Sequence, residues 1–280
     1  MKNSSEKFSN EFSLLLCTYK NDNPQHIREC LDSIIAGTVH PSEMIIVKDG
    51  PLTAELDEVI SNTNFPFETN IISLPTHQTQ GIARREGVAA AKNDWIALMD
   101  SDDVCLPNRF EKQIAEIRRN PKIDIIGGQI AEFSITQSQV HALRQVPIHH
   151  EEILAFARIR NPFNAMAVMF KKDLALKSDN FRYFPGFEDY DLWVRMIKNG
   201  ATCQNCEDVI VHVRTGYGMY SRRRGIGYIK NEWRMQRQLR NLGFITRFIF
   251  IKNIFIRIPV RLFPKPMLES IYIKFLRSKT

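Results

Sequence analysis

Cysteine is scarce in this 280-residue sequence, which contains Cys17, Cys30, Cys105, Cys203 and Cys206. An odd and scattered set does not predict the disulfide framework that holds small secreted domains together. The last two form a single C-x-x-C pair, whereas a zinc ribbon needs a second such pair. The cysteine content therefore argues against a disulfide-rich scaffold and against a structural zinc site.

Long apolar runs are also missing from the sequence. No uninterrupted apolar stretch reaches the about 20 residues that a membrane-spanning helix needs. The opening residues MKNSSEKFSNEF are polar and lack the apolar centre of a secretory signal. These absences predict a cytoplasmic protein, and an apolar fraction of 44% is enough for a sizeable core.

Acidic residues are rare toward the C-terminus. Residues 214–280 contain 16 Lys and Arg against two Asp and Glu, a net charge of +14, whereas the whole chain carries +7. The rest of the chain therefore has a net charge of −7. A basic balance confined to the last quarter predicts that this segment contacts an anionic partner.

The first half has a regular alternation of short apolar runs and segments with helical spacing of apolar residues. The expected strands are 12–17, 43–50, 70–75, 94–100 and 122–128, and the expected helices are 23–36, 53–62, 81–93 and 107–119. This alternation predicts an α/β fold with a Rossmann-like, mostly parallel sheet and helices on both faces.

After residue 128 the alternation loosens. We expect a core strand over 161–170, a helix over 188–200 and a strand over 208–216. The chain then divides into a polar N-terminal segment (1–11), two halves (12–128 and 129–220) and a basic, amphipathic helical tail (221–280).

Three aspartates follow an expected strand in IALMDSDDVCLP, at positions 100, 102 and 103. Ligands of such sheets bind beyond the carboxyl ends of the strands. Mg²⁺ and Mn²⁺ prefer hard oxygen ligands and often bind through one or two carboxylates plus substrate phosphates. Asp100 and Asp102 are therefore candidate metal ligands, and a solvated acidic turn is the alternative.

Other candidates lie at strand ends or helix starts. Asp49 could accept a hydrogen bond from a base or ribose, or simply form a D-G turn. Tyr19 offers a ring for a base to stack on, and Arg84 lies near a helix start that attracts anions. Glu188 and Asp189 begin another helix, where acids serve either as caps or as a general base.

Taken together, these stretches resemble family 2 glycosyltransferases, which have the GT-A fold. The resemblance runs from about residue 12 to 215 and rests on five motifs in order. They are FSLLLCTYKNDNPQHIRECLDSI, IIVKDG, GIARREG, IALMDSDDVCLPNR and FPGFEDYDLWVRMIKNG. Within the family the sequence is most similar to bacterial enzymes that build O-antigen or capsular polysaccharide.

The resemblance implies roles for individual residues. Asp102 would be the direct ligand of Mn²⁺ or Mg²⁺ with Asp100 beside it, and Asp189 would be the catalytic base, with Glu188 as its rival. The nucleotide-binding set would be Thr18, Tyr19, Asp49, Arg84 and Ser101. The sequence departs from the family at Lys48, where the first aspartate of V-D-D is usual.

The implied reaction is an inverting transfer of a hexosyl or N-acetylhexosaminyl group from a nucleotide-sugar, with UDP-sugars favoured. The acceptor would be a hydroxyl of a lipid-linked polysaccharide at the inner face of the bacterial plasma membrane. One alternative is a catalytically silent nucleotide- or membrane-binding GT-A module. Another is a sugar nucleotidyltransferase, which should carry a glycine-rich loop where this sequence has CTYKNDNP.

The basic tail and the late strand complete the candidates. Apolar residues of the tail are interrupted by bases, which suits a helix lying in the headgroups of an anionic membrane, while a helix that closes the fold is the alternative. Nucleic acid is not expected, because no recognition motif accompanies the charge. The candidates for contact with diphosphate or acceptor are His212, Arg214, Arg222 and Arg223, and a buried structural histidine is the alternative for His212.

Overall fold

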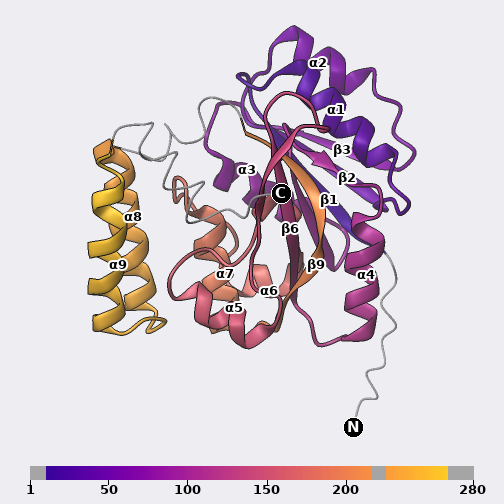
Figure 1. Ribbon diagram of the computed structural model, residues 1–280. Helices are drawn as coiled ribbons and strands as arrows, with labels where there is room; N and C mark the ends of the chain where they lie inside the picture. Colours follow the sequence, from indigo (N-terminus) through magenta and orange to yellow (C-terminus); the bar gives the residue numbers. More distant parts are fainter. Residues whose placement is uncertain (1–10, 216–224, 264–280) are drawn as a thin grey trace.

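The computed structural model describes residues 11–215 and 225–263, and Figure 1 shows the arrangement of their helices and strands. One sheet runs through this part of the chain in the order β3-β2-β1-β4-β8-β6-β9-β5, with β7 beside β6. The strands are β1 (Ser13–Thr18), β2 (Glu43–Lys48), β3 (Glu68–Ser73), β4 (Trp95–Asp100), β5 (Val104–Cys105), β6 (Ile125–Phe133), β7 (Val140–Arg144), β8 (Met169–Lys171) and β9 (Cys203–Arg214).

Helices cover both faces of the sheet. They are α1 (Pro24–Ile35), α2 (Ala54–Ser61), α3 (Gln80–Ala90), α4 (Arg109–Arg119), α5 (His150–Ala157), α6 (Lys172–Lys177), α7 (Glu188–Lys198), α8 (Gly225–Asn241) and α9 (Arg247–Val260). Leu14 and Leu16 of β1 pack in the same core as α1, α2 and α4, whereas Leu15 packs in the core that α3 and α7 cover. This alternation follows from the two-residue period of a strand and confirms the predicted layers.

The parallel strands bring the predicted residues to one edge. β1 pairs in parallel with β2 and with β4, so Thr18 lies beside Lys48 and Cys17 beside Asp100. The D-x-D turn therefore begins at the carboxyl edge of the sheet, next to the end of β1, where ligands of α/β folds bind.

The expected strand over 161–170 is largely wrong. Residues Ala165–Ala167 form a 3₁₀ turn, and only the short β8 follows. Asn164 turns the chain, because its side-chain amide donates to the carbonyl of Gly128 across 2.8 Å. Pro162 also has no backbone N–H to donate to a neighbouring strand.

The two C-terminal helices pack on the body of the protein rather than standing apart. Figure 1 shows α8 and α9 side by side, next to α7. An apolar cluster joins Tyr190 and Val194 of α7 to Met235 and Leu239 of α8 and to Phe250 of α9. Among the described residues, no helix is both long and apolar enough to cross a bilayer.

Candidate active site

A cleft of about 1620 Å³ opens at the carboxyl ends of β1 and β4. The sheet edge, the start of α3, the start of α7 and the inner side of α8 and α9 all contribute to its walls. The candidates that line it are Thr18, Tyr19, Asp49, Arg84, Asp100, Ser101, Asp102, Glu188, Asp189 and Arg214. The structure therefore brings together ten side chains that the sequence singled out separately.

One described candidate, His212, does not line the cleft. His212 pairs with Val104 between β9 and β5, and its ring lies 6.4 Å from that of Phe133. Its neighbours Val213 and Arg214 line the cleft, but His212 does not. The structure therefore favours the alternative for His212, a structural histidine, over contact with the diphosphate or the acceptor. Arg222 and Arg223 lie outside the described residues.

Asp49 holds the loop before α3, which carries one ring of an aromatic pair. Its Oδ2 lies 2.9 Å from Nδ1 of His77, and its Oδ1 accepts the backbone N–H of Gln78 across 2.7 Å. The ring of His77 in turn stacks on Tyr19, with centroids 5.6 Å apart and an interplanar angle of 27°. Both carboxylate oxygens of Asp49 thus hold the loop, and the stacked rings form the surface at this end of the cleft.

Lys48, the departure from the family pattern, is turned away from this end. Its ammonium pairs with Asp57 of α2 across 2.6 Å. The residue therefore stabilises the strand–helix packing and does not line the cleft.

Asp22 is a cleft residue that the sequence analysis missed. Its Oδ2 accepts hydrogen bonds from the Ser101 hydroxyl at 2.8 Å and from the Tyr19 backbone N–H at 3.2 Å. Burial raises the pKa of this carboxyl above its usual value, against the lowering effect of these hydrogen bonds. Asp22 fastens the loop after β1 to the D-x-D turn. The sequence feature that could have identified Asp22 is an acidic residue shortly after the first strand.

The three aspartates of the turn differ in their surroundings. Asp102 is exposed in the cleft, whereas Asp103 is buried and accepts the backbone N–H of Arg214 across 2.9 Å. Burial, with the nearby charges of Asp102 and Asp100, raises the pKa of Asp103 well above its usual value. Asp103 therefore connects the turn to β9, while Asp100 and Asp102 face the cleft.

Asp100 and Asp102 fit the donor set that a hard divalent cation needs. The contacts of Asp100, from Arg84 at 2.7 Å and Gln80 at 3.2 Å, both use Oδ1. No group of three or more His, Cys, Asp or Glu side chains in residues 11–215 and 225–263 is arranged to hold a metal by itself. The geometry suits a Mg²⁺ or Mn²⁺ ion held by one or two carboxylates together with substrate phosphates.

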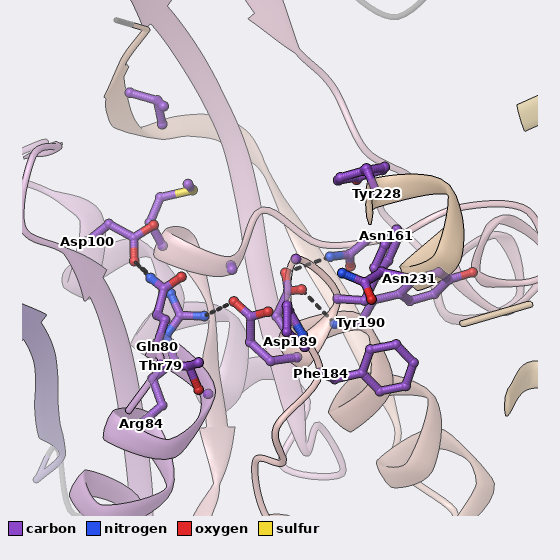
Figure 2. A pocket seen from close by; sticks show the side chains of 18 of the residues that line it. Thr79, Gln80, Arg84, Asp100, Asn161, Phe184, Asp189, Tyr190, Tyr228 and Asn231 are labelled. Carbon is purple, nitrogen blue, oxygen red and sulfur yellow. Dashed lines mark hydrogen bonds and ion pairs between the residues drawn. The ribbon is translucent and has the colours of Figure 1, made fainter. Parts of the chain in front are cut away.

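Arg84 stands between the D-x-D turn and the start of α7. One terminal nitrogen contacts Asp100 at 2.7 Å, and the other lies 3.9 Å from Oε1 of Glu188, as the dashed lines in Figure 2 mark. Its side chain is 4% exposed. Gly81 permits this arrangement, because a Cβ there would lie 2.4 Å from the carbonyl oxygen of Arg182 and 3.1 Å from Cβ of Glu188. The two helix starts can therefore approach closely around the arginine.

The two acids at the start of α7 have different environments. Burial, and next the charge of Asp189, raise the pKa of Glu188 to about 7, although Arg84 opposes the shift. Asp189 is half-buried; its Oδ2 accepts the side-chain amide of Asn161 and its Oδ1 the backbone N–H of Tyr190, each across 2.7 Å. In Figure 2, Asp189 lies between Arg84 on one side and Asn161 and Asn231 on the other. Asn161 is the second residue that the sequence analysis missed.

Basic side chains gather where α5 and α9 line the cleft. Arg158 and Arg160 follow α5, and Lys252 lies on α9; all three line the cleft. The backbone of this segment is held against α9, because Asn253 donates to the carbonyl of Arg158 across 2.9 Å. The cleft is therefore acidic at the D-x-D turn and basic where α5 meets α9.

Arg214 lines the cleft and also holds the elements around it together. Its guanidinium pairs with Glu29 and donates to the backbone carbonyls of Asp102 and Ile135. It lines the cleft, but its contacts hold the D-x-D turn against α1 and β9.

Known proteins resemble this chain along most of its length. It is 33% identical over 266 residues to an amylovoran biosynthesis glycosyltransferase of Erwinia amylovora, which covers 94% of this chain and 98% of that protein. It is 32% identical over 267 residues to a UDP-Gal:alpha-D-GlcNAc-diphosphoundecaprenol beta-1,3-galactosyltransferase of Escherichia coli, which covers 95% of this chain and 97% of the relative.

The fold has solved counterparts as well. A mannosyltransferase of Pyrobaculum calidifontis, solved with GDP-Man and Mn²⁺, superimposes with a TM-score of 0.62 at 13% identity, over 93% of this chain and 72% of the other. At that identity the likeness establishes the GT-A fold. The model of glycosyl transferase family 2 matches residues 13–177, more than half of the chain. With the D-x-D turn, the arginine and the acids of α7 in one cleft, this chain belongs to glycosyl transferase family 2.

Proposed function

We propose that the chain is a metal-dependent, inverting glycosyltransferase that moves a hexosyl or N-acetylhexosaminyl group from a nucleotide-sugar to a hydroxyl of a growing, lipid-linked surface polysaccharide. The observation that carries this proposal is the placement of Asp189. It lines the same cleft as Asp100 and Asp102, with Arg84 standing between the two groups of acids.

The nucleotide end of the donor fits the wall formed by β1, β2 and the loop before α3. The stacked rings of Tyr19 and His77 offer an aromatic surface for a base. Ser101 and Thr18 add hydroxyls at the edge between base and diphosphate. We favour a UDP-sugar, since a relative of 32% identity is named for UDP-Gal.

The diphosphate belongs at the D-x-D turn. Asp102 and Asp100 would hold the Mn²⁺ or Mg²⁺ ion there, and the Arg84 guanidinium adds fixed positive charge beside Asp100. When bound, the ion neutralises the charge that develops on the departing diphosphate. The positive end of α3 acts in the same direction.

Asp189 is placed to act as the base. Its carboxylate accepts the proton of the acceptor hydroxyl as the new oxygen–carbon bond forms at the anomeric carbon. The bond from that carbon to the diphosphate breaks on the opposite face, and the nucleoside diphosphate leaves with the electron pair. Asn161 and the Tyr190 N–H hold the carboxylate in place, and Glu188, with its raised pKa, carries a proton part of the time and so limits the charge beside it.

The acceptor fits the basic end of the cleft. A lipid-linked sugar of the kind that the E. coli relative's name describes carries a diphosphate between sugar and lipid. Arg158, Arg160 and Lys252 supply positive charge where α5 meets α9, on the side of Asp189 away from the D-x-D turn. The acceptor sugar then reaches Asp189 while its diphosphate meets these bases.

The test compares transfer and donor binding in Asp189→Asn and Glu188→Gln. We expect Asp189→Asn to lower kcat by about 10² or more, the usual contribution of a general base, while donor binding measured by thermal shift is unchanged. Glu188→Gln should retain more activity. Near-normal transfer by Asp189→Asn would rule it out as the base, and transfer lost only in Glu188→Gln would assign the role to Glu188.

A further inference from the structure

Helix α9 exposes several large apolar side chains on the outside of the protein, in addition to those that it buries. Phe248 and Phe255 are 76% and 75% exposed, and Ile251, Ile256 and Leu262 are exposed beside them. Phe248, Ile251, Phe255 and Leu262 are spaced by three, four and seven residues and Ile256 adjoins Phe255, so they form one stripe along the helix and the residues after it. A surface helix of a globular protein normally turns such a stripe toward the core.

Asn253 and Arg257 of α9, and Arg261 just after it, make polar contacts on the inner side of the helix, alongside the buried Phe250. Glu232 of α8 is fully buried, and its oxygens lie 2.5 Å from Arg257 and 3.2 Å from Arg261. Asn253, also buried, donates to Gln236 across 2.9 Å and to the carbonyl of Arg158 across 2.9 Å. This network fixes how α9 is rotated about its axis, because a turn that buried Phe248 and Phe255 would expose both arginines and leave Glu232 unpaired.

The charge around the apolar stripe indicates what it meets. Arg247 and Lys252 are exposed on α9, next to Phe248 and Ile251. The segment from 214 to 280 carries a net charge of +14. Apolar residues that enter the boundary between headgroups and acyl chains, flanked by bases that attract anionic lipids, are what an interfacial helix requires. A water-facing partner helix would not need this excess of positive charge.

We propose that the outer face of α9, formed by Phe248, Ile251, Phe255, Ile256 and Leu262, docks on an anionic lipid bilayer. Ile256 belongs to this face and also lines the cleft. Docking therefore brings the basic end of the cleft to the level of the headgroups. If the proposed function is right, this is where the diphosphate of a lipid-linked acceptor lies.

The experiment measures binding of the full-length chain to vesicles of phosphatidylglycerol and phosphatidylcholine, without any nucleotide-sugar. We expect wild type to sediment with these vesicles, and less with pure phosphatidylcholine or at high salt. The pair Phe248→Gln and Phe255→Gln should weaken binding by about tenfold or more, since each removes a large apolar side chain from the bilayer. The matched control is Ile135→Gln, which changes a side chain that is 76% exposed on another part of the surface.

Equal binding by the paired variant and the wild type would overturn the proposal, as would a wild type that ignores anionic vesicles. A wild type that does not bind anionic vesicles is the result expected if residues 264–280 or a second copy of the chain cover this face. The molecular mass measured by light scattering would distinguish a monomer from a dimer and so identify which of them covers it. Failure of the proposed glycosyl transfer can be distinguished from failure of membrane docking. Transfer to a water-soluble acceptor does not require docking, and Asp189→Asn should bind vesicles as well as wild type does.

Discussion

Asn161 donates its side-chain amide to Asp189, with 2.7 Å between Nδ2 and Oδ2. The two residues are 28 positions apart, one in the loop before the 3₁₀ turn and the other in the first turn of α7. This contact fixes the orientation of the carboxylate that faces the acceptor side of the cleft. Asn161 is thus a positioning residue for the proposed base.

Replacing Asn161 with Ala should lower kcat and leave the donor KM nearly unchanged. The carboxylate would keep its bond to the Tyr190 N–H but lose the one that sets its direction, and small errors of orientation at a reacting group cost about tenfold or more in rate. Steady-state kinetics with varied donor and varied acceptor measures this. Asn62→Ala, at the exposed end of α2, is the control. If Asn161→Ala lowered the melting temperature of the protein as well as kcat, Asn161 would instead have a general structural role.

Removing a carboxylate from the D-x-D turn should abolish metal-dependent donor binding. In the wild type, a nucleotide-sugar at 100 times its Kd adds about 2.7 kcal/mol of stability, which a thermal-shift assay detects easily. We expect this shift with Mn²⁺ but not with a chelator, and we expect Asp102→Asn to lose it. A panel of UDP-, GDP- and dTDP-sugars would also identify the nucleotide.

The control for this assay is Asp208→Asn, which changes an exposed aspartate that pairs with Lys112. A donor shift that survives both the chelator and Asp102→Asn would mean that the diphosphate is held without a metal, with Arg84 as the main source of positive charge. No shift with any nucleotide would favour a silent module over an enzyme.

Glu188 should make the protein less stable as the pH rises. Burial raises its pKa from 4.5 to about 7, so the folded protein retains a proton that the unfolded chain releases. Between pH 4.5 and pH 7 the free energy of unfolding therefore decreases as the pH rises, and the total decrease reaches about 3 kcal/mol once the pH passes 7. The stabilising effect of the bound proton is fully present below pH 4.5.

The variant Glu188→Gln has no proton to lose at this position. Its free energy of unfolding should therefore fall less than that of wild type between pH 5 and pH 8, as chemical denaturation at the two pH values would reveal. Glu86→Gln, on the exposed side of α3, is the control. Parallel curves for wild type and Glu188→Gln would contradict the raised pKa.

Much of the donor side could be predicted from the sequence because its signals are local. An apolar run followed directly by acids places Asp100 and Asp102 at a strand end, and parallel pairing then brings Asp100 beside Cys17 at the end of β1. The pairing of Asn161 with Asp189 could not be predicted this way. It depends on how the loop before β8 packs against α7, and no periodic pattern encodes that contact.

The packing of the basic C-terminal tail was also difficult to predict, because it too depends on contacts between separate elements. Its composition predicted a basic amphipathic helix that lies on a membrane, and the alternative was a helix that closes the fold with a solvated basic face. Periodicity defines two faces of a helix but not which one is covered. In α9 the covered face combines Phe250 with Asn253 and Arg257, because Glu232 on α8 pairs with Arg257 and Arg261, and Phe248 and Phe255 are left outside. Only the packing of α8 against α9 determines this.

Arg158 should contribute to acceptor binding and not to donor binding. It lies after α5, lines the basic end of the cleft and is held through its backbone by Asn253. A charged hydrogen bond to a phosphate oxygen contributes about 1.5–3 kcal/mol. We therefore expect Arg158→Gln to raise the KM of a detergent-solubilised acceptor that carries a lipid diphosphate by about tenfold, with the donor KM unchanged.

A second acceptor separates charge recognition from other effects. With a soluble acceptor of the same sugar but no phosphate, Arg158→Gln and wild type should react alike, since no anion meets the guanidinium. Arg119→Gln, a change on α4 at a side chain that is 75% exposed, is the control with both acceptors. An equal rise in KM for both acceptors would mean that Arg158 shapes the cleft rather than binding the diphosphate. The basic end would then have to be assigned another role.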